Sequence, residues 1–140
     1  MHQFCPFQVF AGLLLLFSLA GCEPQIVLDL PSADTIVAIE ISDGYVQKQE
    51  HTLKSSQVIF QVMRLVQRNN SGWSVPFGTF PTPKASAAFK NRNGTIDFVL
   101  WFGPDWVGAR SFSGQRTDSY IWAVGIDVRE QLERILGVGA

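Results

Sequence analysis

Three aspartates are the residues whose type and spacing come closest to a catalytic set. Asp97, Asp105 and Asp118 lie on or beside predicted strands, and paired carboxylates at a suitable separation hydrolyse glycosidic bonds. Asp105 and Asp118 also stand in predicted turns, where an aspartate commonly bonds to nearby backbone, and Asp97 alone is centred in a strand. Aspartates at such positions are more often exposed strand or turn residues with no catalytic role. A cell-wall glycan hydrolase that uses Asp97 and Asp105 is therefore an alternative function.

Nucleophilic and metal-dependent chemistry has less support. A serine hydrolase needs a base beside its nucleophile. Apart from His2, the chain offers only His51, which lies in a polar segment, and it contains no G-x-S-x-G sequence. We interpret His51 as a solvated loop residue and expect neither catalytic residues nor a cofactor. We also expect no zinc site built on histidine and cysteine, because too few of these ligands are present.

Aromatic residues give a stronger indication, because four tryptophans are more than the core of a small domain usually needs. Trp101 faces away from the apolar stripe of its predicted strand. Together with Tyr120 or Trp122 from a neighbouring strand, it would form an exposed patch of the kind that binds proteins, peptides or sugars. Arg110 and Arg116 would flank this patch.

A proline-rich stretch, Trp73 to Lys84, would contribute to the same surface. Its three prolines exclude a regular helix and disfavour a central strand, and its aromatic residues are too apolar for an idle loop. In one interpretation the stretch is part of the binding surface; in the other it folds across the sheet face and forms a second small core. The residues that we predict to contact a ligand are Trp73, Phe77, Phe80, Trp101, Trp106 and Arg110.

An apolar run from Val9 to Ala20 precedes every charged residue of the chain. It covers 12 residues, whereas a helix needs about 20 to cross the hydrocarbon core of a bilayer. The run therefore predicts a removable leader rather than a membrane-spanning helix. The small residues Ala20 and Gly21 would let a peptidase bind the extended backbone just before Cys22.

The tetrapeptide Leu19-Ala20-Gly21-Cys22 resembles the lipobox of bacterial lipoproteins and matches it at all four positions. The resemblance implies cleavage before Cys22, a diacylglyceryl group on its thiol and a further acyl chain on the new amino terminus. Two or three acyl chains hold a protein on a membrane durably, because each buried methylene contributes about 0.8 kcal/mol. The alternative for the apolar run is a buried helix in a cytosolic domain.

The lipoprotein interpretation divides the chain into a signal peptide at 1–21, a tether at 22–33 and one domain at 34–140. In enteric bacteria, an aspartate directly after the acylated cysteine tends to keep a lipoprotein in the inner membrane. Glu23 stands at that position here and therefore favours the outer membrane, with the domain in the periplasm or at the cell surface. We expect no disulfide, because Cys5 leaves with the leader and Cys22 is acylated. The balance of 11 basic and 12 acidic residues argues against nucleic acid as a partner.

Hydrophobic periodicity predicts an α+β domain. A period of two predicts strands at 35–42, 85–91, 95–102, 106–112 and 119–124. Helical spacing predicts one helix over 55–68 and another that begins with Asp127 as its cap. The segment 45–54 is expected to be a polar connection. The order β-α-β-β-β-β-α favours an antiparallel sheet with both helices packed on one face. The helix stripes are Ile59, Val62, Met63 and Val66, then Val128, Leu132, Ile135 and Leu136.

The sequence thus favours a membrane-anchored envelope lipoprotein that is not an enzyme. We expect it to bind a protein or envelope component through the aromatic sheet face and the proline-rich loop. The alternatives are the glycan hydrolase and a purely structural or assembly accessory. Exposure of the four tryptophan side chains distinguishes these functions, because burial of all four would remove the binding patch.

Overall fold

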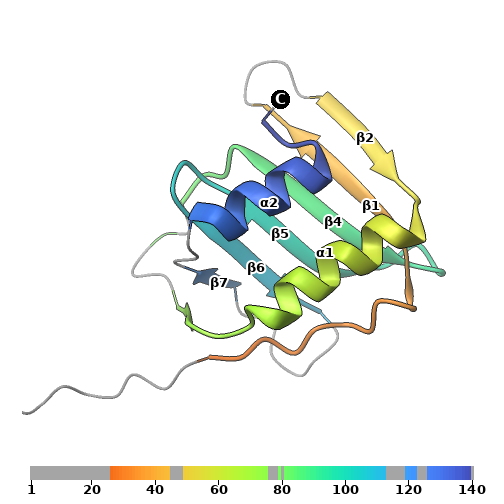
Figure 1. Ribbon diagram of the computed structural model, residues 1–140, viewed down its shortest axis with the longest axis horizontal. Helices are drawn as coiled ribbons and strands as arrows, with labels where there is room; N and C mark the ends of the chain where they lie inside the picture. Colours follow the sequence, from red (N-terminus) through yellow and green to blue (C-terminus); the bar gives the residue numbers. More distant parts are fainter. Residues whose placement is uncertain are drawn as a thin grey trace, which may run out of the picture.

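A computed structural model of the chain describes residues 26–44, 49–75, 79, 81–112, 119–122 and 126–139. These residues form one antiparallel sheet and two helices (Figure 1). The strands are β1 (Ile36–Asp43), β2 (Gln49–Leu53), β3 (Trp73–Ser74), β4 (Ala85–Asn91), β5 (Ile96–Phe102), β6 (Val107–Ser111) and β7 (Ser119–Trp122). The helices are α1 (Ser56–Arg68) and α2 (Ile126–Leu136).

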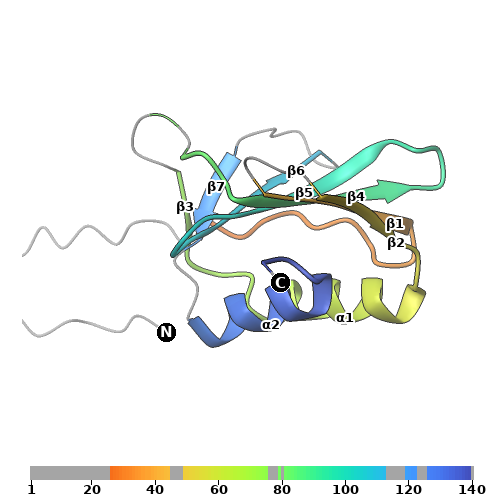
Figure 2. The ribbon, with the colours of Figure 1, turned by 90° about the horizontal axis from the view of Figure 1, so that it is seen from above.

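The seven strands that the structure describes lie in the order β2-β1-β4-β5-β6-β7-β3, and each neighbouring pair is antiparallel. β4 to β7 follow one another as a meander. β3, which comes between α1 and β4 in the chain, forms the far edge beside β7. Both helices lie on the same side of the sheet (Figure 2). The predicted α+β class, with two helices on one face of an antiparallel sheet, is confirmed.

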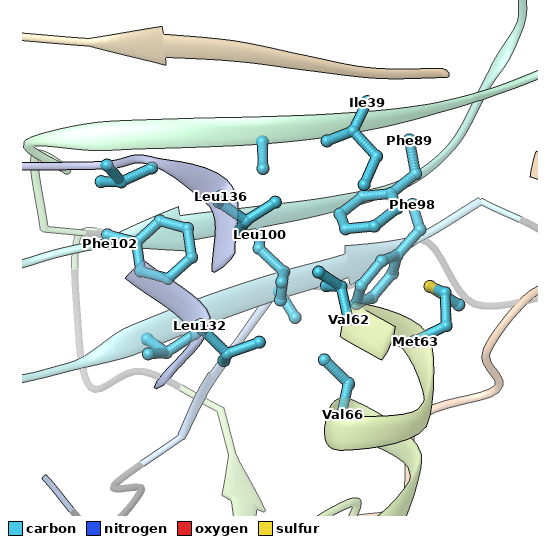
Figure 3. Close-up of a cluster of buried hydrophobic side chains, with 14 of the residues drawn as sticks. Ile39, Val62, Met63, Val66, Phe89, Phe98, Leu100, Phe102, Leu132 and Leu136 are labelled. Atoms are coloured by element: carbon cyan, nitrogen blue, oxygen red, sulfur yellow. The ribbon is translucent and has the colours of Figure 1, made fainter. Parts of the chain in front are cut away.

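The hydrophobic core lies between the sheet and the helices (Figure 3). Ile39, Phe89 and Phe98 are in register on this side, and the ring centroids of the two phenylalanines are 5.3 Å apart. Burial of each such side chain contributes about 1.5–3 kcal/mol. The helices present the stripes that their spacing predicts. The buried helix residues are Ile59, Val62, Met63 and Val66 of α1, and Leu132 and Leu136 of α2. Val128 and Ile135 of the predicted α2 stripe pack against the core while partly buried.

The helices begin close to their predicted positions. The Ser55 hydroxyl oxygen accepts a hydrogen bond from the Val58 backbone N–H at 3.4 Å, which pairs one of the donors that the first turn of a helix leaves free. Arg68 lies in the last turn of α1, where a cation offsets the negative end of the helix dipole. α2 begins at Ile126, so Asp127 lies inside its first turn and is not its cap.

Two strands lie where the sequence predicts none. β2 occupies part of the predicted polar connection 45–54, and four of its five residues are exposed, so it lacks the alternation of a half-buried strand. β3 lies at the start of the proline-rich stretch, where Trp73 pairs with Trp122 of β7. The last strand is described as far as Trp122, and the rest of its predicted range, 123–124, lies outside the described residues.

The segment that the sequence predicts as a tether packs on the domain from Ile26 onward. Ile26 forms an isolated antiparallel bridge with Trp73 at the edge of the sheet. Leu28 is 5% exposed and belongs to the core, and Leu30 and Ala33 pack against the core while partly buried. The folded body therefore begins before residue 34.

The buried side chain of Asn70 holds this segment in place. Its Nδ2 donates to the Leu28 carbonyl oxygen at 2.7 Å. Its Oδ1 accepts from the Leu28 N–H at 3.0 Å and from the Trp73 indole N–H at 3.0 Å. One amide thus pairs both backbone polar groups of Leu28, as a neighbouring strand would.

We predict that Asn70→Ala lowers the free energy of unfolding by about 1–3 kcal/mol, because buried groups of Leu28 and Trp73 lose their partners. Asn69→Ala is the matched control. The Asn69 side chain donates to the Leu65 carbonyl oxygen within the same helix end at 2.8 Å, and its loss should cost less than about 1 kcal/mol. Chemical denaturation measures both losses, and equal losses would contradict the role given to Asn70.

Candidate functional site

The side of the sheet away from the helices carries the candidate site. Side chains alternate across a strand, so Trp101, between the buried Leu100 and Phe102, points to this side. Its register neighbours are Ser86 on β4 and Gly108 on β6, so small residues stand on both sides of the half-buried indole. We call this surface the outer sheet face. Its positions on β4 to β7 are Ser86, Ala88, Val99, Trp101, Gly108, Arg110 and Ile121.

Tyr120 does not share this face with Trp101. Tyr120 is 7% exposed and belongs to the core, and Trp122 is in register with the buried Val107. The residue of β7 in line with Trp101 is Ile121. The prediction that Tyr120 joins Trp101 is therefore wrong, and the side chain of Trp122 lies outside what the structure describes. Residues 120–122 are all apolar, so their sequence does not indicate which of them point to which side of the sheet.

Trp73, another predicted contact residue, also lies in the core. Its side chain is 2% exposed, and its indole N–H is bonded to Asn70. Trp73 therefore stabilises the fold and is not accessible to a ligand in this structure. Phe77, Phe80 and Arg116 lie outside the described residues.

Trp106 is half-buried at the turn that joins β5 to β6. Gly103 donates its N–H to the Trp106 carbonyl oxygen at 2.9 Å. The indole lies directly over this glycine, because a Cβ added at Gly103 would be 2.0 Å from two atoms of the ring. The guanidinium of Arg129 on α2 donates to the carbonyl oxygen of Pro104. Trp106 thus closes a turn that is joined to the helix layer, which is a structural role.

We predict that Gly103→Ala lowers the free energy of unfolding by about 1–3 kcal/mol, because the added methyl group would overlap the Trp106 ring. In a Trp106→Ala background the ring is absent, and the same substitution should cost less than about 0.5 kcal/mol. A double-mutant cycle from chemical denaturation measures this coupling. Purely additive losses would show that the ring does not pack on Gly103.

Arg110 is half-buried on the outer sheet face. Its register partner on β5 is Val99, which is 8% exposed although both helices lie on the other side. Its Cζ is 5.7 Å from the centroid of the Phe112 ring. Its Nε is buried and has no hydrogen-bond partner among the described residues.

The outer sheet face has an apolar half and a polar half. Trp101 and Ile121 are half-buried and form the accessible part of the apolar half on β5 and β7, and Val99 beside them is buried. On β4 and β1, the Lys90 ammonium forms an ion pair with the Glu40 carboxylate at 2.7 Å. An apolar strip beside a charged margin is the usual composition of a protein interface.

Asp97 and Asp105 are too far apart to act as a catalytic pair. Asp97 lies near the start of β5, and Asp105 lies beyond its other end. The strand from Asp97 to Phe102 alone spans roughly 17 Å, at about 3.4 Å per residue, whereas the carboxylates of glycosidases lie about 5–9.5 Å apart. Asp97 Oδ1 accepts a hydrogen bond from Asn91 Nδ2 at 2.9 Å, so it supports the β4–β5 hairpin. The hydrolase that uses this pair is excluded, and Asp118 lies outside the described residues.

His51 lies in β2 and not in a loop, although the residue is exposed as predicted. Its Nε2 is 3.2 Å from the carbonyl oxygen of Leu136, so its ring links the edge strand to the end of α2. Within the ranges that the structure describes, no three His, Cys, Asp or Glu side chains come together in a way that could hold a metal ion.

A groove of about 820 Å³ lies in the helix layer, bordered by residues 30–33, α1 and the second half of α2. Phe60 on its wall is 53% exposed. Its charged lining residues are Arg64 and Arg68, and the described residues around it include no carboxylate. The sequence does not predict this groove, because Phe60 falls outside the buried stripe of α1. The feature of the sequence that could have indicated the groove is Phe60, an aromatic residue on the polar side of the predicted helix.

A smaller hollow, of about 640 Å³, lies beside the β4–β5 hairpin and contains Asp34, Arg92 and Asp97 in its lining. The Ser32 hydroxyl donates to the Asp34 carboxylate. This bond, the Asp34 backbone N–H and the Arg92 guanidinium lower the pKa of Asp34 below its usual 3.8. Asp34 is therefore ionised at neutral pH and is not available there as a general acid.

These features define a small α+β protein with a half-buried indole on the sheet face away from the helices and a groove lined by two arginines in the helix layer. Comparison with protein-family models, curated proteins and solved structures found no match. Among the residues that the structure describes, no helix combines the length and the apolarity needed to cross a membrane.

Proposed function

We propose that this protein is a lipid-anchored lipoprotein of the bacterial cell envelope that binds a protein or another envelope component and is not an enzyme. The lipobox-like Leu19-Ala20-Gly21-Cys22 supports the anchor. Glu23 supports the outer membrane, with the domain in the periplasm or at the cell surface. The observation that carries the binding role is Trp101 between Ser86 and Gly108 on the sheet face opposite the helices.

The outer sheet face would bind its partner mainly by stacking. The part of the indole that stays exposed between its small neighbours would pack against an aliphatic chain, an aromatic side chain or the face of a sugar ring. Arg110 would donate N–H groups to carbonyl or carboxylate oxygens of the same partner. Such binding needs no pair of carboxylates, which agrees with the separation of Asp97 and Asp105.

We predict that the mature protein begins at an acylated Cys22. Mass spectrometry of the protein purified from bacterial membranes should show a chain that lacks residues 1–21 and carries acyl groups on Cys22. Cys22→Ser should prevent both changes, whereas Cys5→Ser, which alters a thiol of the leader, should prevent neither. An intact Met1 terminus with an unmodified Cys22 thiol would disprove the anchor.

We predict that a photo-reactive residue in place of Ser86 captures the partner in intact cells, because position 86 adjoins Trp101 in register. Trp101→Ala should reduce the yield of the covalent adduct about fivefold or more, since loss of a central aromatic contact costs over about 1 kcal/mol. Trp101→Phe, which keeps an aromatic ring, should retain most of the yield.

The matched control places the same photo-reactive residue at Gln61, which is exposed in the helix-layer groove on the other side of the molecule. Adducts from position 61 alone would overturn binding through the sheet face. Adducts from neither position would favour a structural or assembly accessory, which is the remaining alternative.

A further inference from the structure

One end of the molecule gathers its most exposed apolar side chains. β3, the start of the described chain at Ile26 and the first turn of α2 lie together at this end in two perpendicular views (Figures 1 and 2). Val27, Val75 and Ile126 belong to or directly follow these elements and are 65%, 60% and 63% exposed. They are the three most exposed of the seven exposed large hydrophobic residues in the described part of the chain. We call this surface the β3 end.

The β3 end is also where the chain from Cys22 enters the domain. Four residue steps separate Cys22 from Ile26, and an extended chain covers at most about 3.6 Å per residue, so the two lie no more than roughly 14 Å apart. Ile26 is bridged to Trp73, and Leu28 is bonded to Asn70. An acyl group on Cys22 would therefore hold the β3 end close to the membrane surface.

We propose that the β3 end rests on the bilayer that carries the anchor, with Val27, Val75 and Ile126 among the lipid headgroups. This inference depends on the proposed function and adds the orientation of the domain to it. The three aliphatic side chains leave water when they enter the interface, which favours the contact. The acyl chains supply the proximity, and the side chains select which surface faces the lipid.

The charges at the β3 end indicate which lipid surface it fits. Asp29 lies in the N-terminal segment, Asp105 in the β5–β6 turn and Asp127 in the first turn of α2. Arg129, two residues after Asp127 on α2, is a basic residue beside them. Because basic residues are not in excess, attraction to anionic lipids does not drive the contact. A zwitterionic bilayer should therefore be sufficient, with little dependence on salt.

This orientation leaves both candidate binding surfaces accessible. The sheet and the helix layer extend side by side away from the β3 end (Figure 2), so they would stand on the membrane at one end. The outer sheet face would then point sideways, parallel to the membrane plane. A partner in the same membrane or in the adjacent aqueous space would reach it.

Site-specific labelling tests the contact with the bilayer. The full chain is produced in a bacterium that acylates it, and Val27→Cys, Val75→Cys and Ile126→Cys variants are labelled with an environment-sensitive fluorophore. The introduced thiol reacts alone, because the Cys22 thiol is acylated. In phosphatidylcholine vesicles, emission from each label should rise about twofold or more as the label leaves water. Lipids with a quencher near the headgroup should reduce this emission.

The matched controls lie at the other end of the sheet, in and beside the turn between β4 and β5. Asn93→Cys and Ile96→Cys both replace exposed residues, and their labels should show neither the rise nor the quenching. Near-ultraviolet circular dichroism of each variant checks that it is folded.

Mass spectrometry of the same samples separates two kinds of failure. Absence of acyl groups on Cys22 would overturn the proposed function and this inference with it. Acylated, vesicle-bound protein whose labels at positions 27, 75 and 126 respond no more than the controls would overturn the contact alone. A response that high salt abolishes would likewise overturn an apolar contact. A salt-resistant response at the three positions supports the proposed orientation.

Discussion

The arrangement of this fold depends on the buried amide of Asn70. By bonding to the backbone of Leu28 and to the indole of Trp73, it joins the N-terminal segment, the end of α1 and strand β3. Without it, the buried polar groups of these elements would need other partners or water. Asn70 therefore fixes three features at once. These are the far edge of the sheet, the core beneath that edge and the place where the chain enters the domain.

Sequence periodicity predicts a helix or strand correctly where one side of that element is buried and the other is polar. α1 illustrates this, since its buried stripe and its Ser55 cap follow from spacing and residue type. Periodicity failed where polarity does not alternate. Residues 120–122 are apolar throughout, so their phase depends on pairing with β6. β2 is polar on nearly every residue and is ordered by pairing with β1, which is a tertiary effect.

The candidate site was predictable only in part, for a similar reason. Alternation in β5 places Trp101 opposite the buried Leu100 and Phe102. The small residues beside it, Ser86 and Gly108, become its neighbours only through strand register. In the sequence, Asn70 resembles a residue that merely ends a helix. Its hydrogen-bond partner Leu28 lies 42 residues away, so the sequence around Asn70 does not reveal this contact. Contacts between such distant positions leave no local pattern.

Strand β2 ends the sheet on the side opposite β3. The free side of an edge strand offers backbone N–H and C=O groups to which another chain can add, and this edge-to-edge pairing leads to aggregation. β2 is only five residues long, and Glu50 and His51 are exposed on it, features that disfavour such pairing. The proposed lipid anchor would raise the effective concentration of neighbouring copies on one surface. A short polar edge would therefore help crowded copies remain separate monomers.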